Sequence, residues 1–300
     1  MKRLVIYLAV TFGLAWGLLI PAGFLLGTFE NGEASSPAIL GLTALSMFFP
    51  LVGALAANFA CRSEARIDLC WRPRIKQNVR NYLIAWFTPT VIALLGCIVF
   101  FAAYPHLFDP TMRSYIESSA ATAGLTPDKL ASQMPPTPVL LGETLALSLV
   151  VAPFINMIPA FGEELGWRGM LYPTLAELMP KRSAVLATGI VWGLWHAPII
   201  AMGHNYGMGY EGFPVAGIVT MTLLCTAMSC WLSLLRMRSD SVWPCALAHG
   251  AFNAVANIGV VFCSAGPTLL GPSPLGLVAG IPLTVMGVFC FTRISSQTSS

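Results

Sequence analysis

The sequence is divided into long apolar segments, and this division constrains the fold more than any other feature. A helix needs about 20 residues to cross the hydrocarbon core of a bilayer. Eight segments meet that requirement: Leu4–Gly27, Pro37–Ala60, Tyr82–Ala103, Pro138–Ala160, Ser183–Met202, Phe213–Leu235, Val242–Cys263 and Leu275–Thr292. An open sheet would leave backbone groups unpaired in lipid, and these segments are too long and continuous for barrel strands, so they are expected to be helices. The predicted fold is an all-α, polytopic membrane bundle with about eight transmembrane helices.

The composition agrees with a membrane protein. Of the 300 residues, 56% are hydrophobic and 10% are charged, whereas soluble domains contain about 25% charged residues. The eight cysteines form no C-x-x-C pair, so neither disulfides nor a zinc-finger site is expected. No basic tract carries interleaved aromatic residues, so nucleic acid is not expected as a partner. Residues 1–300 are predicted to form a single integral membrane domain.

The distribution of Lys and Arg predicts the orientation of the helices, because cytoplasmic loops carry an excess of these residues. If the eight helices alternate in direction, one side collects Lys2, Arg3, Arg62, Arg66, Arg72, Arg74, Lys76, Arg80, Lys181, Arg182, Arg236, Arg238 and Arg293. The other side has only Arg113 and Lys129. Both termini are therefore predicted to be cytoplasmic. The expected location is a bacterial cytoplasmic membrane, crossed several times.

Two adjacent carboxylates and a guanidinium lie between apolar segments, in the stretch Gly162–Gly169. Charged groups within a membrane are costly and usually mark a functional site. In a helix, Glu164 and Arg168 lie four residues apart on one face and can pair. Glu163 is rotated by about 100° from that face and is left free for chemistry. The alternative is a purely structural Arg–Glu pair at the end of a span.

The chain around these charges is too long for one straight span. About 40 residues separate Pro138 from Met179, and at about 1.5 Å per residue they exceed the thickness of a bilayer. Pro153, Pro159 and Pro173 predict a kink or a break in this region.

Two histidines lie within later apolar segments. His196 follows Trp192 by four residues, and His249 precedes Asn253 by four residues. Residues four apart share one face of a helix, so each histidine has a companion on its own face. The structural alternative is that these groups form hydrogen bonds between helices. A third histidine, His204, is expected to be solvated in an outer loop.

A glutamate and a histidine can position and deprotonate a water for attack on a carbonyl group. A second histidine and an asparagine can donate hydrogen bonds to the resulting oxyanion. The same groups could instead bind a metal ion. No H-E-x-x-H or G-x-S-x-G motif is present, and every aspartate lies in a predicted loop. A peptidase, a non-catalytic binding protein and a small transporter are the functions that these residues leave open.

The three patterns together resemble the signature of a known family. Glu163-Glu164-x-x-x-Arg168, Trp192-x-x-x-His196 and His249-x-x-x-Asn253 are similar to the motifs of the CPBP family. This family, also called Abi, contains CAAX prenyl proteases and bacteriocin-processing or immunity proteins. The resemblance covers roughly residues 139–258, which would form the catalytic core. It departs from the family at Trp192, where family members usually have Phe.

The resemblance implies an intramembrane endopeptidase of the glutamate type. Its fold would be an eight-helix bundle with a cavity open toward the cytoplasm and the membrane. Glu164 and Arg168 would hold the first motif in shape, and Trp192 would wall the site. The substrate would be a membrane-associated peptide or lipidated protein, such as a prenylated CAAX protein. The alternative within the family is a non-catalytic immunity or binding protein.

The resemblance also implies catalytic roles for four residues. Glu163 and His196 would activate the water, while His249 and Asn253 would form the oxyanion hole. No metal cofactor is expected, because an asparagine is a poor zinc ligand beside two histidines. If zinc were bound instead, Glu163, His196 and His249 would be its ligands.

Overall fold

The computed structural model describes residues 1–32, 36–62, 66–266 and 268–295, and this part of the chain is helical. Its α-helices are α1 (Lys2–Leu25), α2 (Thr28–Asn31), α3 (Pro37–Ser46), α4 (Phe49–Ala60), α5 (Ile75–Ala103), α6 (Arg113–Ala123), α7 (Pro127–Gln133), α8 (Thr137–Val150), α9 (Ala152–Gly166), α10 (Tyr172–Ala176), α11 (Lys181–Trp195), α12 (Ala197–Ala201), α13 (Val215–Ser239), α14 (Trp243–Val255) and α15 (Ile281–Thr292). Short 3-10 turns span Pro105–Leu107 and Val260–Phe262. The described residues contain isolated β-bridges but no strand, in agreement with the predicted all-α class.

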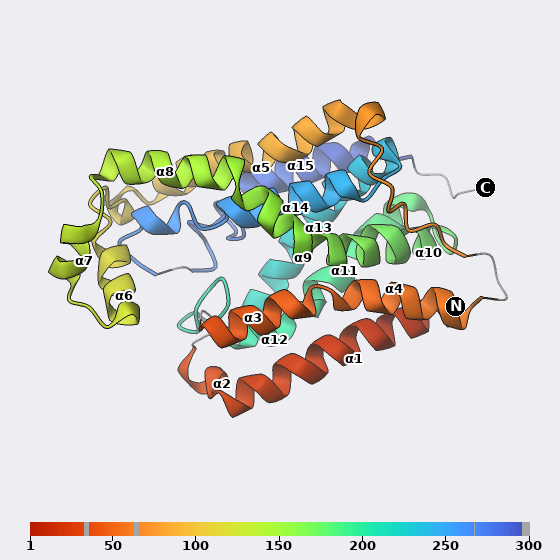
Figure 1. The fold of residues 1–300 in the computed structure, drawn as a ribbon, viewed down its shortest axis with the longest axis horizontal. Coiled ribbons are helices and arrows are strands. Elements are labelled where there is room, and N and C mark those ends of the chain that lie inside the picture. Colours follow the sequence, from red (N-terminus) through yellow and green to blue (C-terminus); the bar gives the residue numbers. More distant parts are fainter. Residues whose placement is uncertain (33–35, 63–65, 267, 296–300) are drawn as a thin grey trace.

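The helices pack as two groups that meet at α9. Helices α1, α3 and α4 form one layer, and α4 packs against α9 (Figure 1). On its other side α9 packs against α14, which contacts α5, while α11 and α15 both pack against α13. The short helices α6 and α7 lie at the opposite end of the molecule from α10 and the start of α1 (Figure 1).

Glycines allow the helices around α9 to approach closely. A Cβ atom on Gly166 of α9 would lie 2.8 Å from the carbonyl oxygen of Pro50 in α4. A Cβ atom on Gly250 of α14 would lie 2.5 Å from the backbone nitrogen of Met157 in α9. Both distances are shorter than a carbon atom tolerates, so these contacts require glycine. The backbone of α9 is therefore held between α4 and α14.

Five helices are long and apolar enough to span a membrane: α1, the α3–α4 pair over Pro37–Ala60, α5, α13 and the segment Trp243–Phe262. Helices α8 and α9 make a sixth candidate if the bent pair is one span. This search covers the described residues, and it makes the chain a multi-pass membrane protein by helix composition. The predicted count of eight stays a prediction, because two of the eight expected segments are not single long helices in the structure.

The fifth and eighth expected segments are not single long helices. The fifth is divided at His196 into α11 and the short α12. Pro198 has no backbone N–H, so it cannot continue the hydrogen-bond ladder of α11. The eighth was expected from Leu275, but α15 begins at Ile281 and has 12 residues. Proline and glycine at positions 271, 272, 274, 276 and 280 favour an irregular chain before it.

The predicted break in the region from Pro138 to Met179 is confirmed. Helices α8 and α9 are bent by 42° relative to each other at Val151. Beyond Gly166 the helix passes through a π-helical turn, Trp167–Leu171, before it continues as α10. In this turn the N–H of Tyr172 reaches back five residues to the carbonyl of Trp167. Such π-turns are rare and occur frequently at functional sites.

Candidate active site

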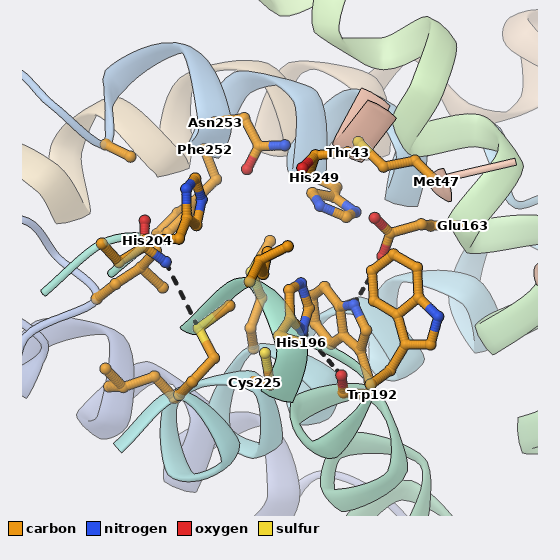
Figure 2. Close-up of a pocket in the computed structure, with 18 of the residues that line it drawn as sticks. Thr43, Met47, Glu163, Trp192, His196, His204, Cys225, His249, Phe252 and Asn253 are labelled. Carbon is orange, nitrogen blue, oxygen red and sulfur yellow. Dashed lines mark hydrogen bonds between the residues drawn. The ribbon is translucent and has the colours of Figure 1, made fainter. Parts of the chain in front are cut away.

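A cavity of about 240 Å³ lies where α9, α11 and α14 meet. It could hold several water molecules, at about 30 Å³ each. All four residues predicted to act in catalysis line it, together with Trp192. Figure 2 shows Glu163 at one end of this space and His204 at the other, with His249, His196 and Asn253 between them. The fold thus brings together residues that are up to 90 positions apart in the sequence.

Glu163 is held in place by two tryptophans. The indole Nε1 atoms of Trp167 and Trp192 both donate to its Oε2 atom, at 2.9 and 2.7 Å. Glu163 is only 1% exposed, and no hydrogen bond to a described residue joins its Oε1 atom. The two donors fix the carboxylate while leaving one oxygen for a ligand in the cavity. Neither histidine contacts this carboxylate directly by hydrogen bond.

Glu164 forms the predicted ion pair with Arg168 and a second contact that joins it to α14. Its Oε1 atom lies 2.9 Å from Nη1 of Arg168 and 3.0 Å from Nδ1 of His249. Glu164 and Arg168 are both completely buried, and the guanidinium carbon lies 4.5 Å above the Trp192 ring. The buried charges are thus paired with each other, and the pair fixes the ring of His249.

The orientation of His196 follows from its backbone partner. Its Nδ1 atom lies 2.9 Å from the carbonyl oxygen of Trp192. A carbonyl oxygen can only accept, so Nδ1 carries the proton and Nε2 is an acceptor in the neutral ring. This orientation arises because His196 ends α11, one turn after Trp192.

Two other polar residues mark the wide part of the cavity. Asn253 is exposed and makes no side-chain hydrogen bond to the described residues. His204, expected to be solvated in an outer loop, instead lines the cavity and is half-buried. Burial lowers the pKa of His204 to about 4, so its ring is neutral at pH 7 and can accept or donate a hydrogen bond.

The candidate zinc ligands do not form a metal-binding group. Across the described parts of the chain, no three His, Cys, Asp or Glu side chains are close enough to hold one ion. Glu163 Oε2 is already occupied by two indole donors, and His249 Nδ1 faces Glu164. The donor set therefore fits the zinc alternative poorly.

Comparison with known proteins relates this part of the chain to a family. Residues 145–255 match the family described as type II CAAX prenyl endopeptidase Rce1-like. That range contains each of the motif residues and the whole of α9, α11 and α13. Over this region, which is less than half of its length, the chain matches the Rce1-like family. The family suggested by the three sequence motifs is thus confirmed.

One curated relative extends the comparison to a named protein. Over 104 residues the chain is 30% identical to the CAAX prenyl protease 2 of Methanococcus maripaludis. The aligned part covers 35% of this chain and 35% of that relative. The similarity to this relative is therefore confined to about a third of each chain.

Sequence reasoning missed three contacts that organise the site. Trp167 follows Glu163 by four residues, so the spacing of residues on a helix face could have indicated their hydrogen bond. The contact between Glu164 and His249 joins positions 85 apart, and no local signal predicts it. Trp192 was expected only to wall the site, but it also donates to Glu163.

Two expectations about the side of the membrane to which the cavity opens conflict with each other. The basic loops were predicted to be cytoplasmic, and the cavity was expected to open toward the cytoplasm. Its lining includes His204, Asn205 and Leu275, which lie in loops at the end of the bundle away from those basic loops. The two expectations cannot both hold for this arrangement.

Proposed function

We propose that this protein is an intramembrane endopeptidase that hydrolyses a peptide bond with a water activated by Glu163. One observation carries the proposal: two indole N–H groups fix Oε2 of a buried glutamate and leave Oε1 facing a cavity of polar side chains. A structural Arg–Glu pair would not need this second carboxylate. The match to the Rce1-like family supports the same reaction.

In the proposed mechanism Glu163 acts as general base. A water bound to its Oε1 attacks the carbonyl carbon of the scissile bond and transfers one proton to the carboxylate. His196 accepts the other O–H of that water through Nε2, because its Nδ1 proton is bound to the Trp192 carbonyl. The nucleophile is thus held by two side chains of known orientation before the bond forms.

The negative charge then develops on the carbonyl oxygen of the substrate. The side-chain N–H of Asn253 donates to this oxyanion. His249 donates to the same oxyanion from Nε2, while its Nδ1 faces the carboxylate of Glu164. When the C–N bond breaks, the leaving nitrogen takes the proton held by Glu163, which restores the carboxylate. No metal ion takes part in these steps.

The proposed substrate class rests on the similarity to the Rce1-like family and on the position of the cavity among transmembrane helices. A membrane-associated peptide or lipidated protein, including a prenylated CAAX-type protein, can reach a cavity among transmembrane helices. The apolar side chains of Met221, Leu224 and Phe252 also line the cavity and suit an apolar side chain of such a substrate.

The test is cleavage of fluorogenic peptides, prenylated and unprenylated, by the purified protein in detergent. Glu163→Gln is expected to lower the rate by about 10²- to 10⁴-fold, because it removes the base. Glu143→Gln is the matched control, since Glu143 is an exposed carboxylate of α8 outside the cavity. Full activity of Glu163→Gln would contradict the proposal and favour the non-catalytic binding or immunity function.

A further inference from the structure

The cavity occupies one half of the bundle along its length. The four residues that α13 contributes are Met221, Leu224, Cys225 and Met228, and all four lie closer to its Val215 end or beside its middle. The loops that follow α12 and precede α15 supply His204, Asn205 and Leu275. No lining residue comes from the basic segments 66–80, 177–184 or 235–243 in the described chain.

Exposure increases along the cavity in the same direction. Glu163 is 1% exposed and His249 is 5% exposed. Asn253 and Asn257, one and two turns farther along the α14 segment, are exposed. The cavity is thus closed at Glu163 and open beside Asn257, and Thr43 of α3 also lines it.

Between Glu163 and the basic loops, the bundle is tightly packed. Trp167, Arg168, Met170 and Leu171 are all completely buried. A Cβ atom on Gly169 would lie 2.9 Å from the carbonyl oxygen of Leu69, so the loop before α5 packs directly on the π-helical turn.

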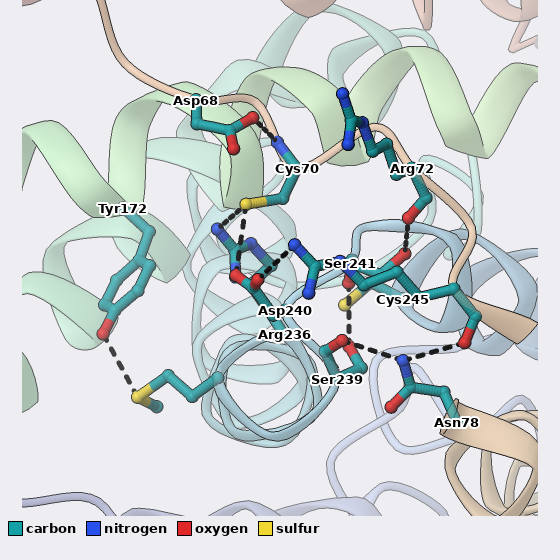
Figure 3. Close-up of polar contacts among 12 residues, drawn as sticks. Asp68, Cys70, Arg72, Asn78, Tyr172, Arg236, Ser239, Asp240, Ser241 and Cys245 are labelled. Carbon is teal, nitrogen blue, oxygen red and sulfur yellow. Dashed lines mark hydrogen bonds and ion pairs between the residues drawn. The ribbon is translucent and has the colours of Figure 1, made fainter. Parts of the chain in front are cut away.

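That loop is fastened across the end of the bundle (Figure 3). Arg74 forms an ion pair of 2.8 Å with Asp240, and the Ser241 hydroxyl donates to the Arg72 carbonyl at 2.7 Å. Asn78 donates to the Ser239 carbonyl at 2.9 Å. A substrate therefore has no path to Glu163 through the basic end.

Charge indicates which side of the membrane each end faces. The closed end carries the basic residues of the loop before α5, the start of α11 and the end of α13. At the open end, the basic side chains are Arg113 and Lys129 of α6 and α7. An excess of Lys and Arg marks the cytoplasmic side of a membrane protein. The closed end is therefore cytoplasmic.

We infer that the cavity opens to the extracytoplasmic side of the membrane. Its substrate, if the proposed peptidase function holds, is a peptide or membrane-anchored segment presented from the outer half of the bilayer. A lipidated tail exposed only in the cytoplasm would face the closed end. This inference rests on the proposed function for the nature of the substrate, but not for the direction of the opening.

The test is thiol labelling in sealed, oriented vesicles of the full chain. Asn257→Cys places a thiol at the open rim, Thr43→Cys places a second rim thiol on the partly exposed α3 lining, and Arg238→Cys places one at the exposed basic end. The wild type gives the background, which is low because seven of its eight free thiols are buried. A membrane-impermeant maleimide is added to right-side-out and to inside-out vesicles.

We expect Asn257→Cys and Thr43→Cys to be labelled at least fivefold more in right-side-out vesicles, and Arg238→Cys in inside-out vesicles. Labelling of the rim and basic-end thiols from the same side would overturn the inference. So would rim thiols that react only from the inside-out preparation, or only after detergent is added. Labelling needs no activity, so its failure is distinguishable from failure of the peptidase proposal, which depends on Glu163.

Discussion

The Nδ1 atom of His249 lies 3.0 Å from the Oε1 atom of Glu164. Because the same oxygen accepts from Arg168, one buried carboxylate connects the first sequence motif to the third. The second carboxylate of the Glu-Glu pair therefore does more than hold its own helix in shape. It orients the imidazole that we assign to the oxyanion.

Glu164→Gln is expected to reduce both stability and cleavage. The substitution leaves the Arg168 guanidinium buried without a counter-charge, which costs about 3–5 kcal/mol, and it removes the partner of His249. The double variant Glu164→Gln/Arg168→Met should recover much of the thermal stability in detergent but not the cleavage rate. Recovery of both would show that Glu164 only neutralises Arg168.

Trp192→Phe is expected to lower the cleavage rate about tenfold. It removes one N–H donor from Oε2 of Glu163 but keeps an aromatic ring beneath Arg168, and a hydrogen bond to a charged group contributes about 1.5–3 kcal/mol. Trp195→Phe is the control, since the buried Trp195 N–H has no partner in the described structure. Equal losses in both variants would mean that ring size, not the hydrogen bond, matters.

Gly166→Ala is expected to destabilise the protein by about 1–3 kcal/mol, because its Cβ atom would overlap Pro50 of α4. Gly142→Ala in α8 is the matched control, with no atom within 4 Å of the added Cβ. Thermal unfolding in detergent should give a lower midpoint for the first variant and an unchanged or higher one for the second. A similar midpoint for both would contradict the close packing of α4 on α9.

Cys70 is expected to resist alkylation at pH 8. Burial raises the pKa of its thiol to about 11, although Arg236 opposes the shift. A raised pKa keeps the thiol protonated below that value, and only the thiolate reacts. Mass spectrometry after iodoacetamide treatment should show reaction at Cys70 increasing between about pH 10 and 11. Rapid modification at pH 8 in the folded protein would contradict this prediction.

Metal chelation is expected to leave cleavage within about twofold of the untreated rate. The proposed nucleophile is generated by Glu163, and the zinc alternative lacks a grouped donor set in the described chain. The measurement is peptide cleavage after dialysis against EDTA or 1,10-phenanthroline. Loss of activity that added zinc restores would instead assign Glu163, His196 and His249 to a metal.

Contacts within one helix could be predicted from the sequence, and contacts between helices could not. The Glu164–Arg168 pair follows from a separation of four residues. The bond from Trp192 to Glu163 joins positions 29 apart and depends on how α11 packs beside α9. The grouping of the three motifs into one site was predicted from the family resemblance. Helical periodicity shows which residues share one face of a helix, but it does not show which other helix that face contacts.

The helix boundaries, too, could be predicted from the sequence only in part. Hydropathy located the long helices α1, α5 and α13, since burial in lipid requires an apolar sequence throughout. It overestimated α15, because the apolar residues before Ile281 are interspersed with proline and glycine that favour loops. Apolar composition alone does not distinguish a buried loop from a span.

The π-helical turn Trp167–Leu171 has a consequence for how the chain tolerates insertions and deletions. Its five-residue step accommodates one extra residue within a single helical turn. The residues after the turn therefore keep the directions that they would have in an α-helix one residue shorter, whereas an extra residue in regular α-helix would rotate everything after it by about 100°. Deleting one residue between Gly169 and Leu171 should therefore leave Glu163, Glu164 and Arg168 in place and keep α10 against α11. The turn is thus the part of this helix that tolerates the loss of one residue.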